Sequence, residues 1–289
     1  MIVNVTAATG QLGRKAVQSL LGKSVDVVAT VRNPEKARSV LGSGATIRHG
    51  DYNAPDTLVK AFADSEVLLL IPSIDPVERR IGQHFNTLQA AKEAGVKRVV
   101  FAGFMAATPE SRFDIAPFLL YAESKLRLSG LDWTILRDGM YLDPIADWLP
   151  ELIRIGRLPY PVKNGRVAYI CRDDLARSLA AACMDDRHSQ RLYKLSGGNA
   201  VSMPELAQII STVVGKTITF DSVSDEEFVK ICKADDEPEE IITTLLSMYQ
   251  AVENGEFEEV TDDVESLTGT PPEPIEIFLR RSFRTVDSV

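Results

Sequence analysis

Cysteine is scarce in this chain of 289 residues, which contains only Cys171, Cys183 and Cys232. The three are far apart along the chain, and none of them forms a Cys-x-x-Cys pair. An odd, scattered set of cysteines does not build a disulfide framework and is typical of a reducing compartment. A chain of this length buries enough apolar surface to fold without disulfides or metals. We therefore expect all three cysteines to be small buried side chains.

Histidine is equally scarce, which limits the metal and nucleophilic chemistry open to the protein. His49, His84 and His188 are the only histidines, and none lies at a metal-ligand spacing from another histidine, a cysteine or an acid. The sequence also lacks a Gly-x-Ser-x-Gly nucleophile elbow and a complete P-loop motif. We expect no metal site and neither serine-hydrolase nor P-loop chemistry.

Long apolar runs are missing as well. No stretch approaches the roughly 18 apolar residues that a membrane-spanning helix needs. Met1 leads directly into the strand-like run Ile2-Val3-Asn4-Val5, without the charged and cleavable segments of a signal peptide. We therefore expect a cytoplasmic protein that does not enter a membrane.

The charge of the chain is unevenly distributed. The formal net charge is −9 at pH 7, and residues 221–265 contain 16 acidic side chains against two lysines, a net charge of −14. Such an acidic block disfavours nucleic acid and anionic lipid as partners. It is typical of a solvated helical surface, and an interaction surface is the alternative.

The first 140 residues alternate short β-branched runs with amphipathic stretches. The run Val67–Ile71 is apolar throughout, as in a parallel strand that is covered on both faces. The alternation predicts an α/β fold with a doubly wound parallel sheet of the Rossmann type. We expect strands at Ile2–Thr6, Val25–Val31, Ala45–Arg48, Val67–Ile71, Arg98–Gly103 and Trp133–Arg137, and helices at Gln11–Leu21, Pro34–Leu41, Pro55–Ala63, Val77–Ala94 and Pro117–Ser129.

After residue 140 the alternation loosens, and no Gly-, Ser- or Pro-rich linker marks a boundary. We predict a Rossmann domain over residues 1–140 and a smaller α/β lobe over residues 141–289 that packs on it. In open α/β folds the ligand lies beyond the carboxyl ends of the strands, where such a lobe would supply the substrate side of a cleft. We expect its helices at Pro144–Ile155, Asp173–Met184, Pro204–Val214, Asp225–Ile231, Glu239–Val252 and Pro274–Arg281, and its strands at Arg166–Ile170 and Arg191–Leu195.

A glycine-containing loop, A-A-T-G-Q-L-G, follows the first strand and leads into the first helix. In Rossmann folds such a loop lets backbone N–H groups approach a pyrophosphate at the helix N-terminus, and glycine leaves room for that approach. Two of the three expected glycines are present, and Ala7 replaces the first. The context between a strand and a helix predicts a dinucleotide site at Thr9, Gly10, Gln11, Leu12 and Gly13.

The end of the second strand indicates which nicotinamide cofactor is bound. NAD-dependent enzymes usually place an acid there to hold the ribose 2′-hydroxyl. This chain has no acid there, and Arg32 follows the strand instead. A guanidinium at this place would form a charge-assisted pair with the 2′-phosphate of NADP(H). We therefore predict NADP(H) as the cofactor, with a solvated surface arginine as the alternative.

Several segments together resemble the NmrA-like branch of the atypical short-chain dehydrogenases/reductases. Within it the resemblance is to bacterial NADPH-dependent quinone oxidoreductases and triphenylmethane dye reductases. It spans almost the whole chain and rests on A-A-T-G-Q-L-G at residues 7–13, V-R-N-P-E-K-A at 31–37, R-H-G-D-Y at 48–52, G-V-K-R-V at 95–99 and I-L-R-D-G-M-Y at 135–141.

The resemblance implies roles for further residues. Asp51 and Tyr52 would border the adenine. Pro72, Ser73 and Gly103 would line the nicotinamide side, and Lys125 would hydrogen-bond the nicotinamide ribose. A last group of three residues would approach the nicotinamide and open into the substrate cleft: Gly139, Met140 and Tyr141.

The segment Tyr121-Ala122-Glu123-Ser124-Lys125 reproduces the Tyr-x-x-x-Lys pair of short-chain dehydrogenases. Residues four apart share a helix face, and a lysine beside a tyrosine favours the phenolate and suits proton exchange with a substrate oxygen. We predict that Tyr121 and Lys125 are catalytic, with Tyr121 as a helper acid and Lys125 as a cofactor contact. A packed core aromatic is the alternative for Tyr121.

Two residues depart from the family pattern. Short-chain dehydrogenases carry a serine near the end of the fifth strand, where this chain has Gly103. The glycine argues against ordinary alcohol–ketone chemistry and predicts open space beside the nicotinamide. Asp138 stands where relatives often carry an amide, and it adds a charge near the cofactor that the sequence does not explain.

The expected function is the reduction by NADPH of a small, flat conjugated acceptor such as a quinone or dye, through hydride transfer. The alternative is a non-catalytic NADP(H)-binding redox sensor, like the regulators from which the family takes its name. Either function is compatible with an oligomer. Six residues would wall a flat apolar pocket, with ordinary core packing as the alternative for each: Phe101, Phe104, Met105, Met140, Tyr141 and Trp148.

Overall fold

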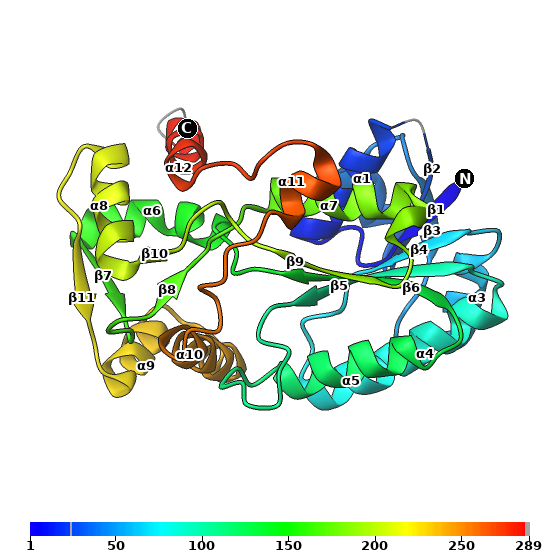
Figure 1. Cartoon of the computed structure of the whole chain (residues 1–289), viewed down its shortest axis with the longest axis horizontal. Helices are drawn as coiled ribbons and strands as arrows, with labels where there is room; N and C mark the ends of the chain where they lie inside the picture. The colour runs from blue at the N-terminus through cyan, green and yellow to red at the C-terminus, as the bar shows by residue number, and fades with distance from the viewer. Residues whose placement is uncertain (24, 287–289) are drawn as a thin grey trace.

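A computed structural model of the chain describes residues 1–23 and 25–286. Its centre is a parallel sheet of seven strands in the order β3-β2-β1-β4-β5-β6-β9. The strands are β1 (Ile2–Val5), β2 (Asp26–Val31), β3 (Thr46–His49), β4 (Val67–Leu70), β5 (Arg98–Phe104), β6 (Asp132–Asp138) and β9 (Arg191–Leu195). Figure 1 shows this sheet between two layers of helices, with a lobe beside it.

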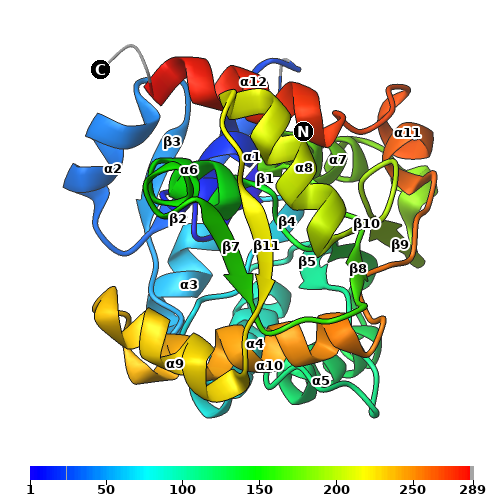
Figure 2. The ribbon, with the colours of Figure 1, turned by 90° about the vertical axis from the view of Figure 1, so that its left-hand side faces the viewer.

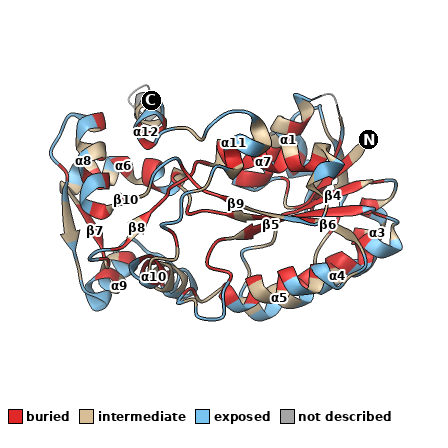
Figure 3. Cartoon of the chain, viewed as in Figure 1, coloured by how far each residue is buried: buried red, intermediate tan, exposed pale blue. Residues whose placement is uncertain are grey.

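Helices cover both faces of the sheet. They are α1 (Gln11–Leu21), α2 (Pro34–Leu41), α3 (Pro55–Phe62), α4 (Val77–Glu93), α5 (Ala116–Arg127), α7 (Arg172–Met184) and α11 (Asp263–Thr268). On one face α1 packs on α7 and α7 on α11, and on the other face α4 packs on α3 and α5. Because of this cover, all four residues of β4 are apolar and buried. Figure 3 shows the buried strands between helices whose outer faces are exposed.

The doubly wound α/β fold predicted from the sequence is confirmed. Helices α1 and α2 have the predicted bounds, and the other elements of the first 140 residues differ from prediction by one or two residues at their ends. The start of α2 shows why the pattern was sufficient. The Asn33 side chain accepts a hydrogen bond from the Lys36 N–H at 3.0 Å, and Pro34 occupies the first turn, where it needs no N–H.

The chain returns to the sheet after residue 140, contrary to the predicted lobe of residues 141–289. Helix α7 packs against α1, and β9 pairs in parallel with β6, with Asp138 beside Leu195. A parallel neighbour for β6 requires a crossover connection, and α7 supplies a helix that buries Leu175 and Leu179 against the sheet. A division at residue 140 therefore does not match the layers of the fold.

The lobe beside the sheet is built from short strands and five helices of the described chain. They are α6 (Asp143–Ile155), β7 (Arg157–Tyr160), β8 (Arg166–Val167), β10 (Val201–Ser202), α8 (Met203–Val214), β11 (Thr219–Ser222), α9 (Asp225–Ala234), α10 (Glu239–Glu253) and α12 (Ile275–Val286). Strands β7 and β11 pair in parallel, and β8 and β10 pair antiparallel. Figure 2 shows β7 and β11 side by side, with α8 above them and α9 and α10 below.

The sequence did not predict β7, β10, β11 or α11. The three strands have four residues or fewer, and a strand that short is specified by its pairing partner more than by its own alternation. The expected strand Arg166–Ile170 is likewise reduced to two residues. The lobe's apolar core extends to Met105 and Met140, which follow β5 and β6, so the lobe packs directly on the carboxyl edge of the sheet.

Candidate functional site

The loop between β1 and α1 closes tightly on itself. The Gly10 N–H donates to the Ala7 carbonyl at 2.9 Å, and Ala7 has a φ of 47°, in the left-handed region that favours glycine. A Cβ on Gly13 would lie 2.3 Å from the Ala7 carbonyl oxygen, whereas a Cβ on Gly10 would lie 3.2 Å from it. Glycine at position 13 is therefore what lets α1 approach the end of β1.

The N-terminus of α1 has the features of an anion-binding site. Gly10 is the N-cap, and no side chain of the described residues caps the helix there. Thr9, Gly10 and Gln11 are exposed, whereas Leu12 and Gly13 are buried below them. The first N–H groups of a helix have no partner within it, and the helix dipole favours negative charge at this end. The five predicted loop residues thus form one site that fits a pyrophosphate.

Arg32 and Tyr52 lie on the β2 and β3 side of this loop. Arg32 follows β2 directly, is exposed, and has no ion-pair partner among the described residues. The Tyr52 hydroxyl donates to the Ile71 carbonyl at 2.6 Å, next to Pro72. Burial raises the pKa of Tyr52 well above its usual value, against the smaller opposing effects of a hydrogen bond to Thr6 and the charge of Arg32. Tyr52 therefore stays neutral and connects the ends of β3 and β4.

A small cavity of about 10 Å³ lies at the end of β4, with room for one water. Tyr52, Pro72 and Ser73 line it, together with His84 from α4. Burial lowers the pKa of His84 to about 4, so its ring is neutral at pH 7, and it packs edge-on to Phe101 at 5.3 Å between ring centroids. No sequence pattern predicts a place in the site for His84, because a single histidine within an amphipathic helix carries no motif.

Tyr121 and Lys125 share one face of α5, as their spacing predicts, and that face is directed at α4. The Tyr121 ring lies 6.3 Å from the His84 ring, and the Lys125 ammonium lies 5.0 Å from the centre of the Phe85 ring. Helix α5 runs from the carboxyl edge of the sheet to its amino edge, and Lys125 is in its last turn, roughly 14 Å along the axis from Ala116. This position does not support a contact between Lys125 and a cofactor at the carboxyl edge, and the catalytic role of the pair stays a prediction.

A buried acid ends β6 at the carboxyl edge of the sheet. Asp138 is 0% exposed, and its Oδ2 accepts a hydrogen bond from the Tyr141 hydroxyl at 3.1 Å. Its Oδ1 has no hydrogen-bond partner among the described residues. Burial raises the pKa of Asp138 to about 8, against the opposing effect of the hydrogen bond from Tyr141. The carboxyl group is therefore mostly protonated at neutral pH.

Tyr141 is held by residues from three parts of the fold. Its ring lies edge-on to Phe104 at 5.6 Å, and the Arg172 guanidinium lies 4.9 Å from the ring centre. Arg172 in turn pairs with Asp143 at 3.7 Å. Burial and the neighbouring Asp138 raise the pKa of Tyr141 well above its usual value, so the phenol is neutral.

Gly139 and Met140, the two residues before Tyr141, are explained by packing. A Cβ on Gly139 would lie 2.7 Å from the Leu195 carbonyl oxygen, so glycine lets the chain pass the end of β9. The Met140 side chain is buried in the core below the lobe, and its carbonyl accepts a hydrogen bond from Ile170 at 3.1 Å. Of this predicted group, Tyr141 is the residue whose side chain is partly exposed.

The open space expected beside Gly103 is absent. A Cβ there would lie 3.3 Å from Cε1 of Phe101 and 3.4 Å from the Leu136 carbonyl oxygen. The reason is that Phe101, two residues earlier on the same face of β5, occupies the space that a larger residue would need. Packing within the sheet thus favours a small residue at position 103.

Four of the six apolar residues expected to wall a pocket belong to or pack against one apolar cluster: Phe104, Met105, Met140 and Trp148. Tyr141 is in contact with Phe104, whereas Phe101 packs against His84 of α4. Trp148 stacks on Tyr160 at 6.1 Å within the lobe. A residue pattern in sequence does not report which face of a strand its members occupy, and this explains why Phe101 was grouped with the others.

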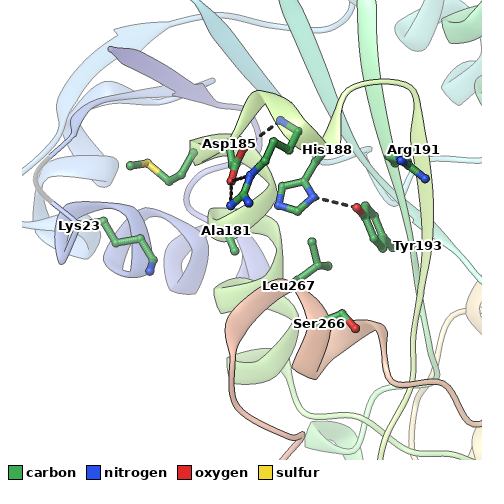
Figure 4. A pocket seen from close by; sticks show the side chains of 10 residues that line it. Lys23, Ala181, Asp185, His188, Arg191, Tyr193, Ser266 and Leu267 are labelled. Carbon is green, nitrogen blue, oxygen red and sulfur yellow. Dashed lines mark hydrogen bonds and ion pairs between the residues drawn. The ribbon is translucent and has the colours of Figure 1, made fainter.

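A groove of about 700 Å³ lies elsewhere, at the amino ends of the strands. Figure 4 shows three of the residues that line it: Arg191 (the first residue of β9), His188 and Tyr193. The His188 Nδ1 and the Tyr193 hydroxyl are 2.8 Å apart. Rossmann cofactors bind at the carboxyl ends of the strands. The groove is therefore separate from the candidate site.

Two kinds of site are absent from the part of the chain that the structure describes. Within residues 1–23 and 25–286, no three His, Cys, Asp or Glu side chains come together as a metal ion would need. None of the described helices has the length and apolar composition needed to cross a membrane. The three cysteines are free and buried.

Comparisons with known proteins agree with this fold and loop. The sequence profile of the NmrA-like family matches residues 1–278. Quinone oxidoreductase 2 of Escherichia coli (strain K12) is 30% identical over 273 residues, which cover 93% of this chain and 94% of that protein.

Solved structures are similar over the same length. A triphenylmethane reductase of Citrobacter sp., complexed with NADP(H), has a TM-score of 0.91 and 32% identity, covering 97% of this chain and 99% of that chain. A Staphylococcus aureus protein described as a nucleoside-diphosphate-sugar epimerase has a TM-score of 0.92 and 34% identity, covering 97% and 100% of the two chains. With a family match that extends over residues 1–278 and a dinucleotide loop of the expected form, this chain belongs to the NmrA-like family.

Proposed function

We propose that this protein is an NADPH-dependent reductase of a quinone, a dye or a similar flat conjugated acceptor. The observation that carries the proposal is the closed loop at the uncapped N-terminus of α1, together with the exposed Arg32 at the end of β2. The relatives named quinone oxidoreductase and triphenylmethane reductase support the choice of acceptor.

The residues at the carboxyl edge fit NADP(H). N–H groups of the first turn of α1 would hold the pyrophosphate, and Arg32 would pair with the 2′-phosphate. Asp51 and Tyr52 would border the adenine, and the segment after β4, with Pro72 and Ser73, would lie toward the nicotinamide. When bound, the cofactor supplies a hydride to the acceptor.

The acceptor would lie beside Phe104 and Tyr141. Both aromatic side chains are partly exposed, and they stand at the carboxyl ends of β5 and β6, where the lobe meets the sheet. Aromatic side chains bind flat conjugated molecules through large apolar contacts, and a few polar groups set the orientation. Holding the acceptor against the cofactor in one geometry supplies most of the acceleration.

We also infer that the protein works in the cytoplasm on a small molecule. Its cysteines are free and buried, which fits a reducing compartment. The net charge of −14 over residues 221–265 disfavours nucleic acid as a partner.

The test is to mix the purified protein and NADPH with several quinones and cationic triaryl dyes, and to follow the absorbance of the reduced nicotinamide. We expect multiple turnovers with at least one flat acceptor and little with simple ketones. Stereospecifically deuterated NADPH would pass its label to the acceptor or slow the reaction.

Tight cofactor binding without turnover of any acceptor would contradict the reductase and favour the redox sensor. Such a sensor would bind NADP⁺ and NADPH with different affinities, since a ligand shifts an equilibrium only by its differential affinity for the two states.

A further inference from the structure

We infer that Asp138 and Tyr141 form the proton source for the reduced acceptor, an inference that rests on the proposed reductase function. Tyr141 donates its hydroxyl proton to the acceptor, and Asp138 supplies a proton to Tyr141 in return. Tyr141 is then the catalytic residue, and Asp138 acts through it.

The geometry of the pair has the parts that a proton source needs. The Asp138 carboxyl is completely buried, and the Tyr141 hydroxyl, 3.1 Å from Oδ2, is its hydrogen-bond partner among the described residues. A buried polar group with one oxygen left unpaired is costly and is rare in native structures without a reason. When the carboxyl is protonated, its O–H can donate to the Tyr141 oxygen, which frees the phenol hydrogen for the acceptor.

The pair also lies where an acceptor would be. Asp138 is the last residue of β6, and Tyr141 follows it by three residues, at the edge where the loop after β1 presents its N–H groups. Tyr141 is partly exposed, whereas Asp138 is completely buried beneath its hydroxyl, to which it is hydrogen-bonded. Tyr121, the acid predicted from the sequence, lies instead on the face of α5 that contacts α4.

The charged groups around the pair favour a protonated Asp138. Arg172 lies over the Tyr141 ring, but it is paired with Asp143. The two cations next to the pair in the sheet are also engaged elsewhere: Arg137 with Glu123 on α5, and Lys194 with Glu259. No cation among the described residues is paired with Asp138, and burial raises its pKa to about 8. The carboxyl can thus hold a proton at neutral pH and release it to a phenolate.

The chemistry of the acceptors decides which reactions need this proton. A quinone takes up a hydride, which brings two electrons and one hydrogen, and its second oxygen becomes an anion. That oxygen takes the Tyr141 proton, Tyr141 takes the Asp138 proton, and solvent later returns one proton to the carboxylate. A cationic triaryl dye takes the same hydride on its central carbon and becomes neutral without any proton.

The experiment compares these two acceptors in Asp138→Asn, Tyr141→Phe and the unaltered protein, over pH 6 to 9. We expect quinone reduction to slow in the unaltered protein as pH rises through about 8, because the carboxyl then loses its proton. Asp138→Asn and Tyr141→Phe are expected to lose roughly a hundredfold in kcat on the quinone, and Asp138→Asn to lose this pH dependence. Dye reduction is expected to show neither effect.

Asp132→Asn is the matched control, because Asp132 begins the strand that Asp138 ends. Its Oδ1 accepts from Ser189 at 2.6 Å at the amino edge of the sheet. We expect this variant to keep the pH dependence of quinone reduction. The infrared carbonyl band of a protonated carboxyl, identified by its loss in Asp138→Asn, gives a second readout that needs no turnover, and we expect it to titrate near pH 8.

The possible results separate the inference from the proposed function. If the unaltered protein consumes NADPH with neither acceptor, the reductase proposal fails, and the inference fails with it. If both acceptors turn over but Asp138→Asn keeps the pH dependence with the quinone, the inference alone is wrong. It is also wrong if the carboxyl is already ionised at pH 6, or if both variants slow the dye as much as the quinone.

Discussion

We predict that cofactor choice in this protein depends on Arg32. It is exposed at the end of β2, where NAD-dependent enzymes usually carry an acid. A charge-assisted contact with the 2′-phosphate is worth about 1.5–3 kcal/mol, or roughly ten- to hundredfold in affinity. We expect Arg32→Ala to weaken NADPH binding by that factor and to leave NADH binding unchanged, as measured by fluorescence titration. Equal affinities for the two cofactors in the unaltered protein would remove this role.

For Lys125, the contact predicted from the motif differs from the position of its side chain in the structure. The Tyr-x-x-x-Lys pattern predicts a contact with the nicotinamide ribose, whose loss would weaken NADPH binding about tenfold. The ammonium instead lies over the Phe85 ring in the last turn of α5. From this position we expect Lys125→Ala to change the dissociation constant of NADPH less than twofold. A tenfold change in the same titration would restore the contact predicted from the motif.

Asp138 also makes the stability of the fold depend on pH. Its pKa is about 8 in the folded protein and 3.8 for an aspartate side chain free in water, so between these values the unfolded state has lost a proton that the folded state keeps. Stability therefore falls as pH rises from about 4 to about 8, by on the order of a few kcal/mol. We expect Asp138→Asn to remove this slope in denaturant unfolding at pH 5, 6.5 and 8. The slope is the readout, because the amide adds a buried N–H₂ of its own, and an unchanged slope would contradict the prediction.

At the scale of elements, a buried ion pair joins α5 to β6. Arg137 donates two hydrogen bonds to Glu123, at 2.7 Å and 2.9 Å, and the two side chains are 18% and 7% exposed. Removing one partner of a buried pair leaves the other charge without compensation, which costs about 3–5 kcal/mol. We expect Glu123→Gln to lower the free energy of unfolding by about that amount in urea.

The control for this pair is Glu151→Gln on α6, where Glu151 is paired with the exposed Arg154. An exposed pair contributes little, because water already stabilises both charges. If Glu123→Gln and Glu151→Gln lower the free energy of unfolding by similar amounts, the buried α5–β6 pair stabilises the fold no more than an exposed pair does.

Sequence patterns were sufficient to predict some helices and strands and not others. Within the first 140 residues, strands covered on both faces and helices that begin at a proline or an N-cap residue were predicted to within one or two residues, because their signals lie within the element itself. The short strands β7, β10 and β11 were missed, because each is held by a partner that is distant in the sequence. The return of β9 to the sheet was missed for the same reason.

For the whole molecule, the proposed site predicts a thermal shift. A ligand that binds only the folded state at 100 times its dissociation constant stabilises the fold by about 2.7 kcal/mol, or roughly 5 °C in Tm for a protein of this size. Because Arg32 adds a contact that NADH lacks, we expect the larger shift with NADPH when both cofactors are present at equal concentration. Equal shifts, or none, in differential scanning fluorimetry would contradict binding through the 2′-phosphate.

Residue patterns alone were enough to predict the Rossmann fold and the membership of the NmrA-like family, and both are confirmed. These features are local or lie along one strand–turn–helix unit, so neighbouring residues are enough to specify them. The roles of the individual site residues stay predictions. Asp138 appeared in the sequence only as an unexplained charge near the cofactor.

Which side chains meet was decided only in the folded structure. There Asp138 pairs with Tyr141, Phe101 closes the space beside Gly103, and Lys125 of α5 lies over Phe85 of α4. The physical reason is that each of these contacts depends on the path of the backbone and on which face of a strand or which turn of a helix a residue occupies. The pKa of Asp138 also depends on tertiary structure. Strands and helices that are distant along the chain exclude solvent from its carboxyl group, and this burial raises the pKa.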